Sequence, residues 1–453
     1  MKKTILLVCA LSFMANAQIK LELIKTLNGN SPTDQLSSIV ALGDINKDGY
    51  DDLALEYYVK SDSSYAKIHF GGDPFDSTKA FVYTNPKPKF IYKGICGGGD
   101  INGDGVNDFV VTYLDNTAIH NPPLYEVQVH FGSKSISHKS DFNITCVALW
   151  NCLINGDYNG DGYDDIIITT LNYGMGEIKI YFGNKALSQN SNLGLYGSTM
   201  LGEFAKITTI VGDVNNDGCD DFLSSANTST SLFPNAAFLF KGGQFLNFDN
   251  SIKFENSGLY GFSNSLGDIN NDGYKDFFIY GINRDIFLGG KQIDPKKPFY
   301  RSPKWLFNGI GDINKDGYCD YVKYLNEYYE LHLGSRQLDT VPVLIMNYLG
   351  NKFINIGDIN GDGDVDIANN DFYNKNKINI YSAKVGTSIN VEKKIPTENQ
   401  LHQNYPNPFN PVTTISYKLQ ALNTQNYKLS SGVYFYRLTT PAATITKKMV
   451  LTK

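Results

Sequence analysis

The chain has 453 residues, of which 42% are hydrophobic and 13% aromatic, enough for a large buried core. Its formal net charge is −6, and it has no basic cluster of the kind that binds nucleic acid. No segment is long and apolar enough to cross a membrane, so the mature chain is expected to lack a transmembrane span.

The first 17 residues have the pattern of a secretory signal peptide. Lys2 and Lys3 form a charged start, residues 5–13 form an apolar stretch, and Ala15 and Ala17 form a small-residue cleavage site. The mature chain would then begin at Gln18. The pattern predicts an exported protein.

A nine-residue motif, D-x-N-x-D-G-x-x-D, dominates the rest of the chain and occurs seven times. In the first copy, Asp44, Asn46 and Asp48 alternate, so a tight loop can turn their side-chain oxygens inward. Gly49 allows the sharp turn, Tyr50 would offer its backbone carbonyl, and Asp52 would complete the set. Hard oxygen donors in flexible geometry suit Ca²⁺ better than Mg²⁺, and the absence of Cys or His side chains from the set disfavours zinc and copper.

All seven copies keep this donor set, which predicts up to seven bound Ca²⁺. The first position is Asp44, Asp100, Asp157, Asp213, Asp268, Asp312 or Asp358. The third is Asn46, Asn102, Asn159, Asn215, Asn270, Asn314 or Asn360. The fifth is Asp48, Asp104, Asp161, Asp217, Asp272, Asp316 or Asp362. The seventh, which donates its backbone carbonyl, is Tyr50, Val106, Tyr163, Cys219, Tyr274, Tyr318 or Asp364. The ninth is Asp52, Asp108, Asp165, Asp221, Asp276, Asp320 or Asp366.

Two other interpretations of the motif are weaker. An EF-hand requires a Glu at position 12, where this chain has residues such as Leu55 and Lys323, and the motifs are followed by β-formers rather than helix. Asn/Asp/Gly turns without a metal would not require three carboxylates at fixed offsets. We therefore expect calcium loops that join strands and that have a structural role.

The spacing of the motifs, 44 to 57 residues, predicts a repeated sheet of four strands. Each motif follows a short apolar segment ending in Gly, and a later strand commonly ends in aromatic-Gly, as at Phe70-Gly71 and Phe131-Gly132. This pattern predicts an all-β fold, a seven-bladed propeller over residues 18–384. The seventh repeat is short, so residues 19–24 are expected to complete its blade and close the ring.

The repeats resemble the FG-GAP or VCBS family, which is also found in the head of integrin α chains. The resemblance rests on the Gly-D-x-N-x-D-G-x-x-D loops and the aromatic-Gly endings. It implies a calcium-binding propeller with a role in adhesion or ligand binding. Some members of the family are attached to polysaccharide lyases.

A polar linker, residues 385–403, precedes a second module at 404–453. The segments Asn404-Tyr405-Pro406-Asn407-Pro408-Phe409, 431–438 and 447–451 resemble a type IX secretion C-terminal sorting domain of type A. The module is shortened, because only residues 420–429 join its two halves. The resemblance implies outer-membrane secretion machinery as a partner and a place at, or release from, the surface of a Gram-negative cell.

The sequence contains none of the G-x-S-x-G, H-E-x-x-H or phosphate-loop motifs, so we expect a binding or adhesion module rather than an enzyme. Its ligand would be an extracellular protein or glycan. The alternative is a carbohydrate-active enzyme, similar to a polysaccharide lyase, on the same scaffold. Aromatic residues beside the loops on the face away from the motifs suggest either a ligand platform or packing between blades: Tyr57, Tyr58, Tyr113, His120, Trp150, Tyr173, Trp305, Tyr324, Tyr328 and Tyr329.

Five cysteines would remain in the mature chain, which is no disulfide framework. Cys146 and Cys152 are the best candidate pair, but small buried residues are the better interpretation. His69, His130 and His332 occupy equal positions in three repeats and are expected to be ordinary strand residues.

Overall fold

The computed structural model of the full chain describes residues 19–385 except 30, 32–33, 60–63, 85–89, 117–120, 173, 198–202, 228–235, 256–262, 282, 303, 326–327, 338–340, 348–352 and 371–376. Outside this range it describes residues 3–4, 400–401, 417–418, 432–439 and 444–451. The chain separates into two compact units, one formed by Ile19–Val385 and the other by Met1–Gln18 together with Gly386–Lys453.

The unit Ile19–Val385 consists of seven antiparallel sheets of four strands each. Blade 1 contains β3 (Gln35–Gly43), β4 (Asp52–Tyr58), β5 (Tyr65–His69) and β6 (Ala80–Tyr83). Blade 2 contains β7 (Phe90–Gly99), β8 (Asp108–Asp115), β9 (Leu124–His130) and β10 (Phe142–Val147). Blade 3 contains β11 (Leu149–Leu153), β12 (Ile166–Asn172), β13 (Met175–Tyr181) and β14 (Leu193–Tyr196). Blade 4 contains β15 (Glu203–Gly212), β16 (Asp221–Asn227), β17 (Ala236–Phe240) and β18 (Ser251–Glu255).

The remaining three blades follow the same order, apart from the outer strand of the last. Blade 5 contains β19 (Ser263–Gly267), β20 (Asp276–Tyr280), β21 (Arg284–Phe287) and β22 (Tyr300–Ser302). Blade 6 contains β23 (Leu306–Gly311), β24 (Asp320–Leu325), β25 (Tyr328–His332) and β26 (Leu344–Asn347). Blade 7 contains β27 (Phe353–Gly357), β28 (Asp366–Asn370), β29 (Lys377–Val385) and β2 (Ile19–Asn28). The one helix of this unit within the described ranges is a short 3₁₀ turn, η2 (Phe248–Asn250).

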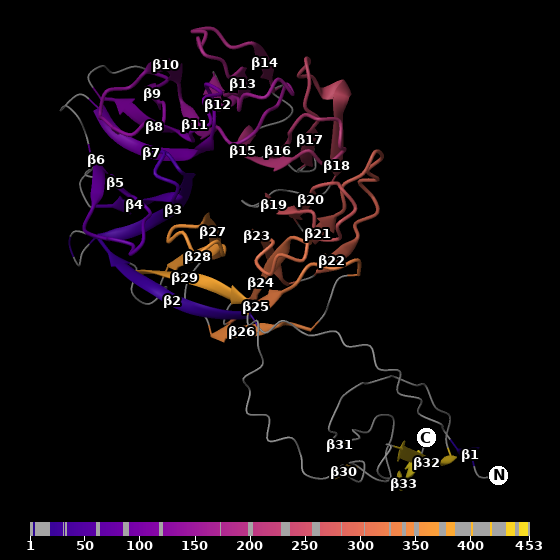
Figure 1. The fold of residues 1–453 in the computed structure, drawn as a ribbon. Helices are drawn as coiled ribbons and strands as arrows, with labels where there is room; N and C mark the ends of the chain where they lie inside the picture. Colours follow the sequence, from indigo (N-terminus) through magenta and orange to yellow (C-terminus); the bar gives the residue numbers. More distant parts are fainter. Residues whose placement is uncertain are drawn as a thin grey trace. The chain divides into compact units, whose positions relative to one another are not determined.

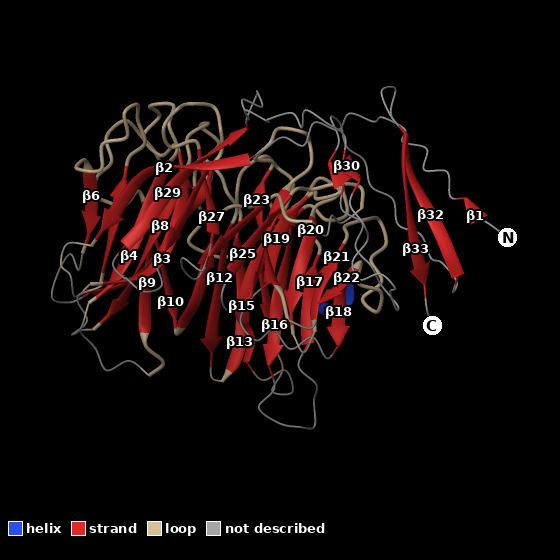
Figure 2. Cartoon of the chain, turned by 90° about the horizontal axis from the view of Figure 1, so that it is seen from below, coloured by secondary structure: helices blue, strands red, loops and turns tan. Residues whose placement is uncertain are grey.

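The first strand of each blade lies innermost, so that β3, β7, β11, β15, β19, β23 and β27 pack side by side around a central axis (Figure 1). Seen edge-on, the strands run across the thickness of the ring (Figure 2). This arrangement confirms the expected all-β, seven-bladed propeller. Each blade has one edge at the central axis, where the innermost strands pack together, and one edge at the rim, and such short, protected edges limit edge-to-edge aggregation.

The ring is closed by pairing the two ends of this unit in one blade. The N-terminal strand β2 pairs antiparallel with β29 over nearly its whole length, from Ile19 opposite Val385 to Asn28 opposite Lys377. In Figure 1 these strands lie side by side, β2 in indigo and β29 in orange. Ile19 and Leu27 are buried, so the pairing also extends the core. The expectation that the N-terminal segment completes the seventh blade is confirmed.

Seven hydrophobic clusters form the core, and each lies between two neighbouring blades. Between blades 1 and 2, for example, Leu42, Ile45 and Ala54 pack against Phe109 and Val111, and all five are fully buried. Alternate residues of each strand point to opposite faces of its sheet, and the second strand is buried on both faces, so apolar residues follow its first Asp in most blades, as in β8. Blade-to-blade packing therefore supplies most of the buried apolar surface of the ring.

The second unit contains short strands that are described by their backbone. β32 (Gly432–Thr439) and β33 (Thr444–Leu451) form an antiparallel hairpin, and β1 (Lys3–Thr4) pairs parallel with β32. β30 (Gln400–Leu401) pairs with β31 (Tyr417–Lys418). Most of the expected signal peptide and of the motif at 404–411 lies outside the described residues. In the part of the chain that the structure describes, no helix has the length and apolar character to span a bilayer.

Candidate metal centre

Each of the seven motifs forms a tight loop that joins the innermost strand of a blade to the second strand. The loop turns twice through left-handed backbone, at its fourth and sixth residues. At the sixth position Gly is present in all seven loops, and Gly49, for example, has φ of 91°. The fourth position has φ between 53° and 73° at Lys47, Gly103, Gly160, Asn216, Asn271, Lys315 and Gly361.

The side chains at positions 1, 3 and 5 fold over the loop and accept its backbone N–H groups. In the first loop, Asp44 Oδ2 accepts the N–H of Gly49 at 2.9 Å, and Asp44 Oδ1 accepts that of Asp48 at 3.1 Å. Asn46 Oδ1 accepts the N–H of Asp48 at 2.9 Å, and Asp48 Oδ1 that of Tyr50 at 3.1 Å. Both bonds to the first-position Asp recur in the other six loops. The three side chains therefore line the inside of a loop whose shape they hold.

The ninth-position Asp lies beneath the loop and connects it to the third strand. Asp52 is fully buried, its Oδ2 accepts the N–H of Ile45 at 3.1 Å, and its Oδ1 accepts that of Gly71 at 2.8 Å. Five other blades repeat both bonds, to Gly132, Gly183, Gly242, Gly289 and Gly334. In blade 7, Asp366 accepts the N–H of Ile359 at 3.0 Å, and its other oxygen has no hydrogen-bond partner among the described residues.

This contact explains the aromatic-Gly endings. A Cβ on Gly71 would come within 2.5 Å of the carbonyl oxygen of Asp51, and a Cβ on Gly132 within 2.3 Å of that of Asn107. Only glycine allows the third strand to approach the loop closely enough for its N–H to reach the buried carboxylate. The sequence showed these glycines, but not that they brace the ninth-position Asp.

The seven ninth-position carboxyls are buried without a cationic partner. Burial raises the pKa of each to about 7, although backbone N–H donors oppose the rise. None takes part in an ion pair within the described ranges. Buried charges are normally paired or bound to a metal, so each loop has the environment of a cation site.

The donor set fits calcium in its chemistry. Each carboxylate oxygen that accepts one N–H keeps a second lone pair, and the set consists of oxygens alone. In the part of the chain that is described, however, no three His, Cys, Asp or Glu side chains converge as a ready-made centre. The physical reason is that the ninth-position carboxylate faces the backbone of its own blade. The structure thus brings positions 1, 3 and 5 together at each loop and holds position 9 below them.

Neighbouring loops also bind one another around the ring. The residue at position 8 donates its N–H to the carbonyl oxygen of position 1 in the preceding loop at six of the seven interfaces. At four of these, its side chain also accepts the N–H of that first-position Asp. These four caps, at distances of 2.7 to 3.1 Å, are Asn107 to Asp44, Asp164 to Asp100, Asp220 to Asp157, and Asp51 to Asp358.

The other three interfaces have Lys275, Cys319 or Val365 at position 8, and bonds from innermost-strand side chains join their blades. One such bond, from Asn151 Nδ2 to the carbonyl oxygen of Thr208 at 3.2 Å, also accompanies the cap between blades 3 and 4. Ser265 Oγ donates to the carbonyl oxygen of Val211 at 3.0 Å. Asn264, Asn308 and Asn355 donate their side-chain N–H groups to carbonyl oxygens of the adjacent innermost strand, at 2.6 to 3.0 Å. We call the first group the capped interfaces and this group the stitched interfaces.

The structure decides between the two interpretations of several aromatic residues. Tyr57, Tyr113 and Tyr329 are buried and pack between rings, as in the 5.0 Å stack of Tyr57 on Tyr65, so they do not belong to a ligand platform. Tyr58 is 53% exposed, and Trp150 and Trp305 are partly exposed. His120, Tyr173 and the side chain of Tyr328 lie outside the described residues.

Three histidines and two cysteines are components of the core. His69, His130 and His332 are buried, and the last two stack on Phe109 and Tyr321 across the strand pair. Cys96, Cys146, Cys152, Cys219 and Cys319 are all free, and Cys146 and Cys152 are buried in the cluster between blades 2 and 3.

Comparison with known families finds a match over one part of the chain. Residues 157–224, which contain the third and fourth loops, match the FG-GAP-like repeat. A search of curated proteins finds no match to this chain.

Solved structures with a similar course of the chain share little sequence with it. One is rhamnogalacturonan lyase YesW, with 13% identity over 79% of this chain and 74% of that chain, at a TM-score of 0.47. Another is the Dos1 propeller, with 9% identity, 80% and 95% coverage, and a TM-score of 0.42. The V. cholerae biofilm matrix protein Bap1 has 10% identity, 81% and 91% coverage, and a TM-score of 0.38.

Proposed function

We propose that this protein is an exported propeller that Ca²⁺ stabilises and that serves as an adhesion or ligand-binding module at the surface of a Gram-negative cell. The observation that carries the proposal is the set of seven buried carboxyls without ion-pair partners, one under each oxygen-lined loop, in the described part of the ring. Bound Ca²⁺ would supply the missing positive charge. Asp, Asn and carbonyl oxygens at positions 1, 3, 5, 7 and 9 would hold it.

Through the hydrogen bonds between neighbouring loops, a bound ion would also affect the interface between two blades. Asp44 shapes its own loop through Gly49 and donates its backbone N–H to Asn107 of the next loop. An ion that orders one loop therefore also orders an interface between blades. A ring stabilised in this way is a rigid support on which exposed loops of variable length can bind a partner at low entropic cost.

The ligand-binding part of the proposal concerns the face opposite the calcium loops. Trp305 directly precedes β23 and is partly exposed, and Lys323 Nζ lies 4.2 Å from the centre of its ring. An aromatic ring beside a cation is a suitable contact for a glycan or an acidic protein surface. We therefore expect Trp305 to contribute to binding of an extracellular partner.

A binding screen tests this part. The calcium-loaded full chain would be applied to glycan and extracellular-protein arrays beside Trp305→Ala and Trp150→Ala variants. Phe245→Ala is the matched control, because Phe245 is 72% exposed beside the calcium loops, where its carbonyl accepts the hydroxyl of Tyr158. Binding that falls at least about tenfold in Trp305→Ala but not in Phe245→Ala supports the proposal. Binding that is equal in all variants contradicts the role of this face.

Export is tested separately, because it depends on the tail. In a Gram-negative host with type IX machinery, the full chain is expected on the cell surface or in the medium, and a chain ending at residue 431 is expected to remain in the periplasm. Equal distribution of the two chains would contradict the proposed sorting role of residues 432–453.

The alternative function, a polysaccharide lyase, depends on the environment of Lys323. A lyase needs a base that is free to take a proton, and Lys323 is the basic residue beside Trp305. Its Nζ lies 2.8 Å from Glu330 Oε2, and the side chain is only 16% exposed. Unsaturated products from acidic polysaccharides incubated with the purified chain would nevertheless establish a lyase and overturn the purely adhesive role.

A further inference from the structure

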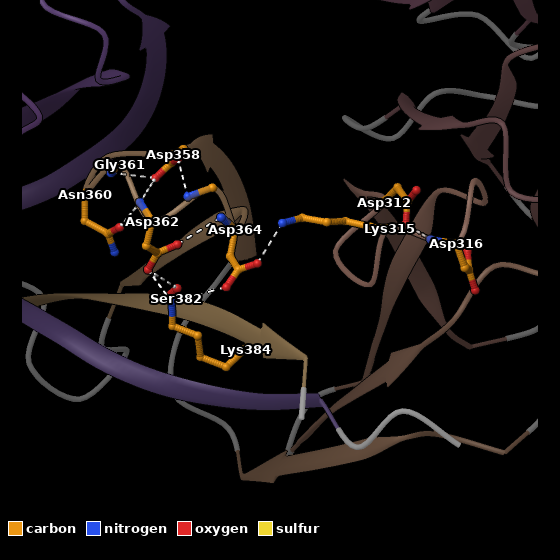
Figure 3. Close-up of polar contacts among 11 residues, drawn as sticks. Asp312, Lys315, Asp316, Asp358, Asn360, Gly361, Asp362, Asp364, Ser382 and Lys384 are labelled. Carbon is orange, nitrogen blue, oxygen red and sulfur yellow. Dashed lines mark hydrogen bonds and ion pairs between the residues drawn. The ribbon is translucent and has the colours of Figure 1, made fainter. Parts of the chain in front are cut away.

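The seventh loop differs from the other six at position 7. It has Asp364 there, where the others have Tyr, Val or Cys, so a carboxylate is added at the position that would offer only its backbone carbonyl in the other loops. Two lysines approach the carboxylates of this loop, and Figure 3 shows both. In the described parts of the other loops, no ion pair reaches a carboxylate at position 1, 5 or 9.

The first lysine comes from the strand beside the loop. Lys384 lies on β29, and its Nζ contacts Asp362 Oδ2 directly and Asp364 Oδ2 at 3.2 Å. Ser382, two residues earlier, donates its hydroxyl to the same oxygen of Asp362 at 3.1 Å. Asp362 is the fifth-position donor, so the ammonium occupies a carboxylate that a metal ion would need. Lys384 is about one-third exposed, which limits screening by water.

The second lysine comes from the preceding loop. Lys315 is the fourth residue of the sixth loop, in left-handed backbone with φ of 59°. Its Nζ lies 2.9 Å from Asp364 Oδ1. Positions 4 and 7 of successive loops also meet elsewhere, since a Cβ on Gly103 or Gly361 would contact the ring of Tyr163 or Tyr50. In the sixth and seventh loops this repeated contact has become an ion pair.

The two ammonium groups together carry the same positive charge as one Ca²⁺. From this we infer that Lys384 and Lys315 act as built-in counter-ions of the seventh loop, which is thereby held without calcium and binds the ion most weakly of the seven. The inference rests on the proposed calcium binding by the other loops. With these two lysines, the shape of the loop in blade 7, the blade that closes the ring, does not depend on the metal.

The position of this loop gives the inference a structural meaning. Lys384 pairs across the sheet with Lys20 of β2, so it belongs to the strand pair that joins the two ends of the propeller. A lysine in the chain is present at every calcium concentration. The ring can therefore remain closed when calcium is scarce, while the other six loops respond to the ion.

Calcium binding to the full chain at neutral pH, measured by equilibrium dialysis and calorimetry, tests the inference. We expect one ion fewer in the tight class than the seven loops would allow. Lys384→Met should recover that ion, with at least about a tenfold gain in affinity at one site. Lys20→Met is the matched control, because Lys20 lies opposite Lys384 but binds Glu22, and it should change nothing. Seven equivalent ions in the unaltered chain, with no change in Lys384→Met, would overturn the inference.

Melting in the presence of chelator provides a second, independent measurement. Without calcium, Lys384→Met leaves Asp362 and Asp364 with one counter-charge fewer, so its Tm should fall by roughly 2 °C and recover when calcium is added. An unchanged Tm in chelator contradicts the counter-ion role of Lys384. If instead the unaltered chain melts at the same temperature with and without calcium, the proposed calcium binding fails, which is a different result.

Discussion

The capped and stitched interfaces join blades of the same strand order, but they differ in the hydrogen bonds that cross them. At a capped interface, a side chain within the loop, such as Asp164, accepts the N–H of the first-position Asp of the preceding loop. At a stitched interface without such a cap, an innermost-strand side chain such as Asn308 donates to the carbonyl oxygen of Phe353. Caps couple a blade interface to the loops of the nine-residue motif, whereas stitches bond neighbouring innermost strands around the axis.

The difference shows that one nine-residue motif leaves room for two kinds of interface. Positions 1, 3, 5, 6 and 9 are fixed by the loop itself, but position 8 faces the neighbouring blade. Where it is Asn, as at Asn107, the residue before the first-position Asp of the neighbouring loop has to be Gly. A Cβ on Gly43 would lie 2.3 Å from Asn107 Oδ1. Burial raises the pKa of Asp51, Asp164 and Asp220, so these caps are costly to ionise and sensitive to nearby positive charge.

The largest expected effect concerns blade 7, where a capped and a stitched interface meet. Leu27 of β2 is 3% exposed in the cluster between blades 7 and 1, so Leu27→Ala should destabilise the ring by about 3 kcal/mol. Leu23→Ala on the same strand is the control, since Leu23 is 57% exposed, and it should cost less than about 0.5 kcal/mol. Denaturant unfolding measures both. Equal losses would show that β2 does not close the ring.

The second prediction compares how acid affects stability through histidines near the capped interfaces and through a histidine near the stitched interfaces. Burial lowers the pKa of His69 and His130, in blades 1 and 2, to about 4. The unfolded chain takes up these protons near pH 6.5 and the folded chain only near 4, so stability is complete above pH 6.5 and is lost as the pH falls from about 6.5 to 4. Each residue contributes about 3 kcal/mol at most.

Replacing either histidine with Phe should therefore flatten the fall in stability between pH 6.5 and 4, measured by urea unfolding in saturating calcium. His332→Phe is the comparison from the stitched region, because His332 Nε2 lies 3.1 Å from Glu330 Oε2, whereas neither ring nitrogen of His69 has a hydrogen-bond partner among the described residues. If His332→Phe reduced the dependence of stability on pH as much as His130→Phe does, this assignment would be contradicted.

A third prediction compares position 8 across the two groups. Asp164→Ala removes the acceptor for the N–H of Asp100 and should cost about 2 kcal/mol, because that donor is left without its partner. Lys275→Ala changes the same position at a stitched interface and should cost less than about 0.5 kcal/mol. Differential scanning calorimetry of both variants decides. Similar losses would mean that the cap contributes nothing specific.

The smallest effect is expected at the stitches. Asn355 donates to the carbonyl oxygen of Ile310 at 3.0 Å and accepts the N–H of Gly357 at 2.8 Å. Asn355→Ala should cost about 1 kcal/mol, and this loss should be the same with calcium and with chelator, because the stitch does not involve a loop carboxylate. A loss that depends on calcium would remove the distinction between the two kinds of interface.

Much of the ring could be predicted from the sequence, because the motif recurs at a spacing that only four short strands fit. The strand pair of β2 with β29 was also predictable, since a short last repeat needs a strand from elsewhere. In both cases the evidence lay in the order and spacing of residues along the chain.

Other features depend on which neighbour a side chain meets, and spacing does not contain that information. Asp52 had the pattern of a plain metal ligand, and its bond to Gly71 became visible only when the third strand was placed beside the loop. Tyr57 and Tyr113 lay near loops in sequence but are buried between rings. Lys384 is 22 residues from Asp362, with nothing in either segment to connect them.

The most direct test of the central claim is thermal unfolding of the full chain at about 1 mM Ca²⁺ and in chelator. If each loop binds with a Kd of about 10⁻⁴ M, each ion adds about 1.4 kcal/mol, and the bound set raises Tm by roughly 10 °C. We expect the chelated protein to melt at a temperature lower by that margin and to recover when Ca²⁺ is restored. Identical melting temperatures in the two conditions would contradict the proposal that metal ions balance the buried carboxylates of the ring.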